Sequence, residues 1–424
     1  MRVHFVTHGC KANQYDTEKF RQELEARGAV AVEDPAEADA CVVNTCTVTN
    51  NADAGARKAI RRLKRDHPQV KIVVAGCSAA LRFDDYAGMS QVDGVVKGHD
   101  AVAVAGMVAP EAPLLERDEE PIGGVLLEKN ERGTRGWMKI QDGCNRRCSF
   151  CATKLARGKS RSRDEDDIVR EARQLADYHR EIVFTGIHIG HYGHDLPGNK
   201  SGNKGEHTLS RLIARLLDEV PGVRFRLGSI EATEIDDLLI DLLEHSGGRL
   251  VPHLHVPMQA GSNNVLRKMR RWHTREQYRE RMLEICDRLP YLGLGADIIV
   301  GFPGETEADF AQTRELVEEL PFTYLHVFPY SERDGTVAAE MDGTIHGDIK
   351  SRRSQELRDL AQAKGEAYHR ARVGQAAEIV VEENDYGVTE DYLRVRLTGN
   401  PDERTGDLVY AALTMADGQL VARV

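Results

Sequence analysis

The sequence predicts an α/β protein with three parts: an N-terminal parallel α/β domain, a central partial barrel of βα units, and a small C-terminal β-barrel. Apolar, β-branched runs alternate with helical patterns over residues 1–110 and again over 134–330, and this rhythm predicts parallel strands covered by helices. About the last fifty residues change to short strands separated by turns. The length agrees, because 424 residues exceed one ordinary core.

The N-terminal domain is predicted over residues 1–112. Three apolar runs predict its strands: VHFVT (3–7), CVVNTC (41–46) and KIVVAGC (71–77). A helical pattern follows each run, and the first of these, DTEKFRQELEARG, stops at Gly28, a residue typical of helix ends. Open sheets of this kind bind ligands at the carboxyl ends of their strands.

Three cysteines lie just past the ends of these strands, namely Cys10, Cys46 and Cys77. The fold therefore predicts that they converge although they are far apart in the sequence. Cys41 begins the strand that Cys46 ends, about 16 Å away along an extended chain. We therefore interpret Cys41 as a small buried hydrophobe, and Cys286 as a core residue of an amphipathic helix.

A charged segment with proline and glycine, residues 113–133, is predicted to be a linker. The barrel is predicted over 134–370, with a helix over 348–370, and the C-terminal domain over 371–424. The apolar runs that predict barrel strands are GWMKIQDGC, EIVFTGIHIG, VRFRLGS, VPHLHVPM, LGADIIVGFPG and TYLHVFPYS. Six such units suit a partial or full βα barrel, and the small terminal barrel is of a kind often used for oligonucleotides.

Composition bounds the class of protein. The N-terminal apolar run is too short for a signal peptide and no run could span a membrane, so we expect a cytoplasmic protein. Cysteine clusters in that setting favour metal or redox chemistry. The net charge of −11 argues against nucleic acid, but basic runs at 57–65, 157–163 and 267–271 leave room for a locally basic RNA-binding face.

A second group of cysteines is compact: Cys144, Cys148 and Cys151 form C-x3-C-x2-C in GCNRRCSFC. An ordinary iron–sulfur cluster takes four cysteines, so three leave one iron open to bind another molecule. Phe150 could shield one side of such a cluster. Zinc would need a fourth ligand or water. The histidines that could serve, which we instead interpret as hydrogen-bonding residues, are His188, His191, His194, His253 and His255.

The compact motif resembles that of the radical S-adenosylmethionine (radical SAM) enzymes. This resemblance implies a [4Fe–4S] cluster whose open iron binds SAM, and a barrel of radical SAM type. Our candidate SAM contacts lie at predicted strand ends, where glycines permit close approach and an acid could hold ribose hydroxyls. They are Gly186, Ser229, Glu231, Gln259 and Gly301.

The combination of both cysteine groups with the terminal barrel resembles the methylthiotransferases over essentially the whole chain. This resemblance implies a second [4Fe–4S] cluster on Cys10, Cys46 and Cys77, so that all six cysteines are metal ligands with catalytic roles, and an RNA-binding TRAM-like tail. Segments 8–18, 42–62, 297–310 and 325–336 look like the MtaB subgroup. That subgroup methylthiolates C2 of N6-threonylcarbamoyladenosine next to the tRNA anticodon and uses two SAM molecules.

The same resemblance implies partners. They are the anticodon loop of a tRNA, an electron donor such as flavodoxin or ferredoxin, and a sulfur donor; we expect a monomer without membrane contact. Arg157, Arg161 and Arg163 are candidates for contacts to tRNA phosphates. The chain departs from the family in ATKLARG (152–158), which lacks the usual proline after the third barrel cysteine.

Two other readings stay open at the level of sequence. The substrate could be isopentenyladenosine of tRNA or an aspartate of a ribosomal protein. A non-enzymatic RNA-binding iron–sulfur sensor would explain the tail and one cluster, but it would not explain the second group of three cysteines.

Overall fold

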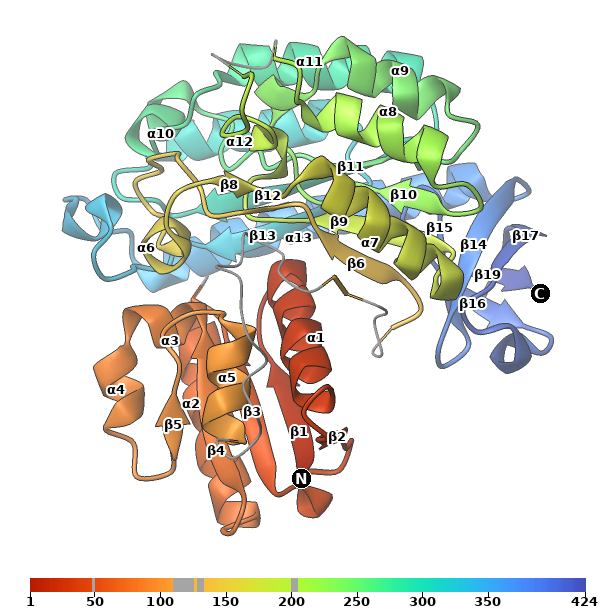
Figure 1. The fold of residues 1–424 in the computed structure, drawn as a ribbon. Helices are drawn as coiled ribbons and strands as arrows, with labels where there is room; N and C mark the ends of the chain where they lie inside the picture. Colours follow the sequence, from red (N-terminus) through yellow and green to blue (C-terminus); the bar gives the residue numbers. More distant parts are fainter. Residues whose placement is uncertain (48–49, 110–125, 128–132, 200–204) are drawn as a thin grey trace.

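The computed structural model describes residues 1–47, 50–109, 126–127, 133–199 and 205–424. Most of the predicted linker over 113–133 lies outside the described residues. Figure 1 shows an N-terminal domain below a wide arc of strands and helices, with a smaller sheet at one end of the arc. The three-part α/β prediction is therefore confirmed.

The N-terminal domain is built on a five-stranded parallel sheet with the order β2-β1-β3-β4-β5. Its strands are β1 (Arg2–Thr7), β2 (Val30–Ala31), β3 (Ala40–Thr45), β4 (Lys71–Gly76) and β5 (Gly94–Val95). Its helices are α1 (Lys11–Glu25), α2 (Asn50–Asp66), α3 (Cys77–Leu81), α4 (Phe83–Ala87) and α5 (Ala101–Val108), with a 3-10 turn η1 (Pro35–Glu37). The order reverses between β1 and β3, and such a switch point opens a crevice at the carboxyl ends of the strands.

Apolar side chains cover both faces of this sheet. Phe20 of α1 and Val104 of α5 pack on one face with Val3, whereas Ile60 of α2 and Tyr86 of α4 pack on the other. Alternate residues of each strand point to opposite faces, so a strand covered on both sides must be apolar throughout. This explains the continuous apolar runs of the sequence.

Two three-stranded parallel sheets form the central domain, with the orders β10-β9-β6 and β11-β12-β13. Parallel bridges between Phe225 and Leu250 and between Ser229 and His255 join them into one arc. The strands are β6 (Gly136–Lys139), β9 (Glu181–Thr185), β10 (Arg224–Arg226), β11 (His253–His255), β12 (Gly293–Val300) and β13 (Tyr324–Pro329). The arc, with β6 and β13 at its ends, is the predicted partial barrel.

Helices cover the outside of the arc (Figure 1). They are α7 (Glu165–Tyr178), α8 (Leu209–Glu219), α9 (Asp237–His245), α10 (Asn263–Lys268), α11 (Arg275–Arg288), α12 (Glu307–Glu319) and α13 (Gly347–Arg372), with 3-10 turns η2 (Ile189–His191), η3 (Ala232–Glu234) and η4 (Val337–Glu340). A short helix α6 (Thr153–Arg157) and a two-stranded ribbon of β7 (Gln141–Asp142) and β8 (Arg161–Ser162) follow β6.

The C-terminal domain is a curled six-stranded sheet with the order β17-β14-β15-β16-β19-β18. Its strands are β14 (Ala376–Glu382), β15 (Tyr386–Thr389), β16 (Arg394–Thr398), β17 (Leu408–Ala412), β18 (Thr414–Ala416) and β19 (Gln419–Arg423), with a 3-10 turn η5 (Pro401–Arg404). Arg224 of the barrel donates to the carbonyl of Glu378 at 2.9 Å, and Arg226 donates to that of Thr389 at 2.8 Å. These bonds fix the small sheet against the amino ends of the barrel strands.

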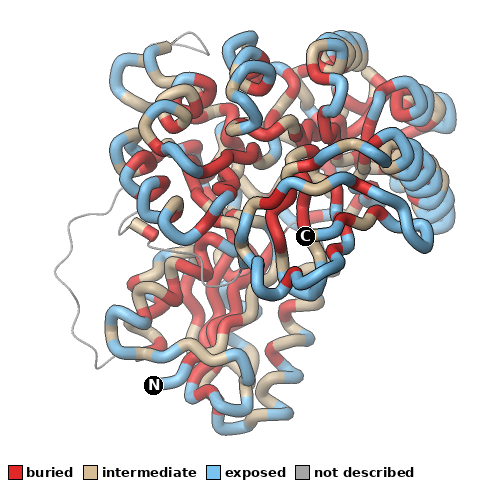
Figure 2. The backbone as a smooth tube through the Cα atoms, turned by 90° about the vertical axis from the view of Figure 1, so that its right-hand side faces the viewer, coloured by how far each residue is buried: buried red, intermediate tan, exposed pale blue. Residues whose placement is uncertain are grey.

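The N-terminal domain also packs against the barrel. Tyr15 of α1 donates to Glu171 of α7 at 3.2 Å, and Asp16 pairs with Lys139 of β6. Figure 2 shows buried backbone continuing from one domain into the other. Among the described helices, none combines the length and the apolar character that crossing a membrane requires.

Candidate active site

The three dispersed cysteines lie together at the carboxyl edge of the N-terminal sheet. Cys10 caps the start of α1, Cys46 follows β3 directly, and Cys77 follows β4 as the first residue of α3. The backbone between β1 and α1 passes against Cys46: a Cβ on Gly9, whose φ is +106°, would lie 2.7 Å from the Cys46 Sγ. The structure therefore brings these cysteines to one edge, and their role as ligands stays a prediction.

Polar groups surround the Cys77 thiol. The Arg157 Nε donates to its Sγ at 3.2 Å, and the His99 Nε2 lies 3.5 Å away. Burial raises the pKa of Cys77 to about 12, whereas the nearby Arg157 cation acts to lower it. A cation held against a buried thiol favours the thiolate, which is the form that ligates metals.

Arg157 itself belongs to a buried ion network. Its guanidinium pairs with Asp16 at 2.7 Å and with Asp142 at 3.0 Å, and Lys139 pairs with both carboxylates. Although burial acts to raise them, Lys139 and Arg157 hold the pKa values of Asp16 and Asp142 below the usual range. The network joins α1 of the N-terminal domain to β6, β7 and α6 of the barrel.

This burial contradicts two predicted RNA contacts. The Arg157 side chain is 1% exposed, and the Arg163 side chain, also 1% exposed, pairs with Glu171 at 3.0 Å. Neither guanidinium is available to phosphate, because the arginines of this basic run are turned inward toward carboxylates. Arg161 is exposed on β8, and its contact with RNA stays a prediction.

The compact cysteines lie on the loop between β7 and α6. The Cys144 Sγ lies 3.6 Å from the His188 Nδ1 and accepts from the backbone N–H of Arg146 at 3.4 Å. The Arg271 Nη1 lies 3.7 Å from the Cys148 Sγ. Burial raises the pKa of Cys148 to about 11, and Arg271 acts to lower it. Donors and cations thus surround this group as they do Cys77.

Phe150 and the segment after the motif complete the loop. Phe150 packs edge to face on Phe302, with 6.4 Å between ring centroids. The segment that lacks the usual proline contains the helix α6, which is followed by Gly158 with a φ of +73°. The short helix turns the chain so that Arg157, its last residue, reaches Cys77.

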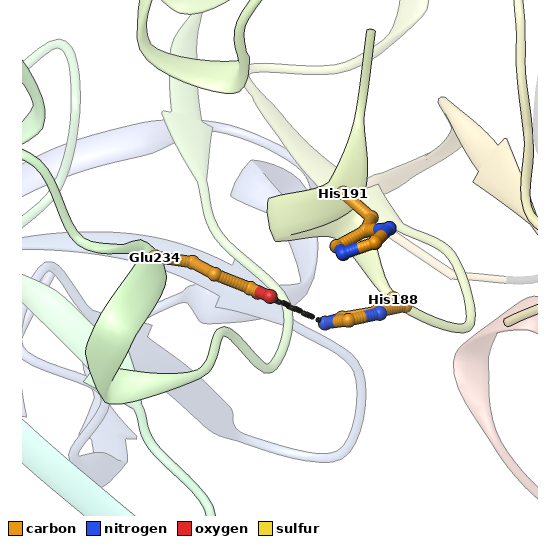
Figure 3. Close-up of side chains that lie close together, drawn as sticks. All are labelled: His188, His191 and Glu234. Carbon is orange, nitrogen blue, oxygen red and sulfur yellow. Dashed lines mark hydrogen bonds and ion pairs between the residues drawn. The ribbon is translucent and has the colours of Figure 1, made fainter. Parts of the chain in front are cut away.

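Figure 3 shows His188, His191 and Glu234 close together. The His188 Nε2 pairs with Glu234 at 2.7 Å, and the His191 ring stacks on His188 at 4.4 Å. Burial acts to lower the pKa of His188, but its hydrogen bonds to Cys144 and Glu234 raise it to about 9. Arg146 also pairs with Glu234 at 2.9 Å, and this cation opposes a metal ion there. The group is better explained as an anchor for Cys144.

Two adjoining cavities connect the cysteine groups. The larger, of about 700 Å³, has Cys10, Cys46 and Cys77 in its wall. The smaller, of about 150 Å³, has Phe150 and Cys151 in its wall. Four residues line both: Thr47, Thr153, Asp297 and Phe328. A molecule bound between the two groups would therefore be reached from both.

Four of the five candidate SAM contacts line these cavities. Gly186, Ser229 and Glu231 lie in the larger one and Gln259 in the smaller one. Gly186 is required by space, because a Cβ would lie 2.8 Å from the carbonyl oxygen of Gln141. Glu231 pairs with Arg271, which links this wall to Cys148.

Gly301 is placed differently. It follows β12 with a φ of +71°, and its N–H donates to Glu305 at 2.6 Å. It is not among the lining residues of either cavity, so the structure gives no support to a contact with SAM. Its positive φ marks the tight turn after the strand.

The two remaining cysteines belong to neither group; Cys41 is buried and Cys286 is half-buried. Cys41 packs in the apolar core beneath α2, and Cys286 packs against the barrel core. Burial raises the pKa of each thiol to about 11. Both interpretations from sequence agree with these positions.

Sequence reasoning missed several residues of the site. Lys11 and Asn13 line the large cavity, as does Tyr392 of the C-terminal domain. Burial lowers the pKa of Lys11 to about 7, with smaller contributions from Arg135 and Arg226. Lys11 and Asn13 directly follow Cys10 in the sequence, and the helical spacing of three residues from Cys10 to Asn13 was a signal that could have found Asn13.

Models of known families match two parts of the chain. Residues 2–97 match an uncharacterized protein family, UPF0004, and residues 138–317 match the radical SAM superfamily. The first match covers the dispersed cysteines and the second covers the compact group.

Whole-length relatives are also found. One is the threonylcarbamoyladenosine tRNA methylthiotransferase MtaB of Bacillus subtilis, with 37% identity, 94% of this chain and 91% of the relative covered. Another is the tRNA-2-methylthio-N(6)-dimethylallyladenosine synthase of Carboxydothermus hydrogenoformans, with 34% identity, 89% of this chain and 87% of the relative covered.

A solved structure shares the fold. It is the radical S-adenosylmethionine methyltransferase TsrM of Kitasatospora setae, with a TM-score of 0.52 and 18% identity, covering 80% of this chain and 77% of that one. That structure contains bound cobalamin and a [4Fe–4S] cluster. At this identity the likeness concerns the fold alone.

Proposed function

The chain belongs to the radical SAM tRNA methylthiotransferases, and from that premise we propose that it transfers a methylthio group to C2 of N6-threonylcarbamoyladenosine at position 37 of tRNA. One observation carries the proposal: the dispersed group Cys10, Cys46 and Cys77 lines one cavity, and Cys151 of the compact group lines the cavity that adjoins it. A single cluster with SAM would account for one group only. Inserting sulfur into a C–H bond needs both a radical source and a sulfur carrier.

The residues present fit two [4Fe–4S] clusters. Cys144, Cys148 and Cys151 would hold the cluster that binds SAM, and the dispersed cysteines Cys10, Cys46 and Cys77 would hold the other. The donor set supports this, because each group has three free cysteines with cationic or N–H donors beside them. The first cluster would supply the electron that cleaves SAM to an adenosyl radical, and this radical would take hydrogen from C2. The second cluster would supply the sulfur, which a second SAM would methylate.

The protein's own side chains position these parts. Arg157 holds Cys77 and ties both domains together. His188 holds Cys144, and Arg271 connects Cys148 to Glu231. Gly186, Ser229, Glu231 and Gln259 are proposed to contact SAM. The buried walls would exclude water from reactive species.

The domains divide this work in the proposal. Residues 1–112 provide the sulfur-carrying site, 134–370 the radical SAM barrel, and 371–424 an RNA-binding surface, with Arg161 on the barrel as a further phosphate contact. The bound tRNA presents its anticodon loop to the cavity. An external electron donor and a sulfur donor complete the reaction, and the chain acts as a monomer in the cytoplasm.

Product analysis tests the assignment. The protein is reconstituted anaerobically with iron and sulfide, then incubated with SAM, reductant and tRNA that carries N6-threonylcarbamoyladenosine. Mass spectrometry of the nucleosides is expected to show the methylthio product. A parallel reaction uses tRNA that carries N6-dimethylallyladenosine. Product from the second tRNA alone would mean that the substrate is N6-dimethylallyladenosine. No product from either tRNA would overturn the proposal.

A further inference from the structure

One end of the large cavity is built from side chains that the proposed mechanism does not use. Lys11 of α1 and Tyr392 of the C-terminal domain lie there with His253 of β11 and Tyr324 of β13. The rings of His253 and Tyr392 stack at 4.3 Å, and the Tyr324 hydroxyl lies 2.8 Å from the His253 Nε2. Three separate parts of the chain thus form one aromatic wall around Lys11.

The Lys11 ammonium is the cation of this wall. Its Nζ lies 5.2 Å from the centre of the Trp137 ring and 5.5 Å from that of the Tyr392 ring. The ion pairs found among the described residues give Lys11 no carboxylate partner. Aromatic faces stabilise a cation only in part, so the half-buried ammonium of Lys11, which lines the cavity, is suited to an anionic ligand.

The nearest carboxylates are already neutralised by arginines. Glu181 pairs with Arg224 and Arg226, each at 2.7 Å, and Glu382 pairs with Arg135 at 3.0 Å. Arg135 also lies 3.5 Å from Glu181. Among the described residues Lys11 therefore has no ion-pair partner, and an anionic group bound at this end of the cavity would pair with its protonated form.

We propose that Lys11 is the specificity-determining residue that binds the carboxylate of the threonylcarbamoyl group. The inference rests on the proposed function and deepens it. The two substrates that the relatives' names give differ at this point, because a threonylcarbamoyl group ends in a carboxylate and a dimethylallyl group is apolar. An ammonium among aromatic rings pairs with the first and would be left unpaired and desolvated by the second.

Kinetics with Lys11→Met tests the pairing. Methionine keeps an unbranched side chain of similar length without the charge. For tRNA that carries threonylcarbamoyladenosine, the variant is expected to lose about 10- to 100-fold in kcat/KM, the effect of one charged hydrogen bond, mainly through KM. Lys11→Arg is expected to recover part of the loss, because it restores a cation.

A modified substrate shows whether Lys11 binds the threonine carboxylate or another anion. An anticodon stem-loop is made with the threonine carboxylate reduced to an alcohol. Wild-type protein is expected to lose about the same factor on this substrate, and Lys11→Met is expected to lose no more. If Lys11→Met instead lowered kcat/KM by the same factor relative to wild type on both substrates, Lys11 would serve a partner common to both, such as a phosphate or SAM, and the proposal would be overturned.

Iron content and a second variant keep the result interpretable. Lys11 follows Cys10, so each variant is assayed for iron and sulfide and for its melting temperature. Lys97→Met, at an exposed position outside the cavity, is the matched control and is expected to behave as wild type. Failure of the proposed function would remove product from wild type itself, whereas failure of this inference would leave wild-type product and erase the Lys11 effect.

Discussion

The two groups of cysteines reach similar surroundings by different routes. The compact group lies within one loop, and its contacts to His188 and Arg271 come from the same barrel. The dispersed group lies on three strand ends, and its contact to Arg157 comes from the other domain. The compact group and its contacts are formed within the barrel, whereas the dispersed group, formed at the edge of the N-terminal sheet, gains its Arg157 contact only when the two domains pack together.

The two cysteine groups are therefore held in place by different residues. Arg157 is held by Asp16 of the N-terminal domain and by Asp142 of the barrel, so any change in domain packing reaches Cys77 through one guanidinium. The compact group has no comparable dependence among its described contacts. Changes at the two sites should therefore separate SAM cleavage from sulfur insertion.

The largest effects are expected from the cysteines themselves. Cys148→Ala is expected to abolish both 5′-deoxyadenosine and methylthio product, more than 1,000-fold each (order of magnitude). Cys77→Ala is expected to abolish the methylthio product while 5′-deoxyadenosine still forms. Chromatography of the small molecules and mass spectrometry of the tRNA measure the two activities.

Iron analysis completes this pair of variants. Each cysteine change is expected to remove about half of the iron and sulfide of the reconstituted protein, because each group would hold one cluster. If Cys77→Ala kept full iron and full product, the dispersed cysteines would not be ligands, and the assignment of one cluster to each group would be wrong.

Breaking the support of the dispersed group is expected to cost stability. Arg157→Met leaves Asp16 and Asp142 with one cation fewer in a buried site, and removing one member of such a network typically costs about 3–5 kcal/mol. Methylthio product should fall further than 5′-deoxyadenosine, because Cys77 loses its donor. Urea unfolding and the two product assays measure these effects.

Arg161→Met is the matched control for this prediction. Arg161 belongs to the same basic run but is exposed, so its change is expected to shift the free energy of unfolding by less than about 0.5 kcal/mol. Equal losses of stability in both variants would show that the buried network has no special role.

This arginine also shows what the sequence could and could not predict. The strands, the three domains and the positions of the cysteines followed from local periodicity and spacing. The partners of Arg157 did not, because Asp16 lies 141 residues earlier in the chain and meets it only after the domains pack. The basic run RGKSRSR therefore suggested a solvated or RNA-binding face, although alternate arginines point into the protein.

The residues that line the cavities were also predicted only in part from the sequence. Gly186, Ser229, Glu231 and Gln259 were found because strand ends of a barrel gather at one edge. Gly301 has the same local signature, but its N–H donates to Glu305, and the residues of β12 that line the smaller cavity are Asp297 and Ile299. Lys11 and Tyr392 lie near opposite ends of the chain, and no local sequence pattern predicts a contact between them.

The dependence of the free energy of unfolding on acidic pH tests the role of the buried ion network. The pKa values of Asp16 and Asp142 are held below the usual range by Lys139 and Arg157, against the effect of burial. Their stabilisation is therefore complete above the unfolded pKa of about 4 and is lost as pH falls toward the folded values. The free energy of unfolding should decrease below about pH 4, by up to about 1.4 kcal/mol per pH unit for each group.

Asp142→Asn isolates one of these groups. The variant is expected to be less stable at pH 7 and to lose stability less steeply below pH 4, because it takes up one proton fewer on unfolding. Urea unfolding from pH 7 to pH 3 gives the two slopes, with the exposed Asp84→Asn as control. Parallel slopes for wild type and Asp142→Asn would contradict the network.

The smallest effects are expected at the two cysteines outside both groups. Cys286→Ala and Cys41→Ala remove packed sulfur atoms without touching either site, since Cys41 lies in an apolar core and the half-buried Cys286 packs against one. Each variant is expected to lose about 1 kcal/mol of stability and to keep the iron content and both products of wild type. A loss of iron in Cys41→Ala would be the informative exception. Cys41 is the second residue of β3, the strand that Cys46 follows, so such a loss would mean that the dispersed site responds to packing within its own sheet as strongly as to the domain interface.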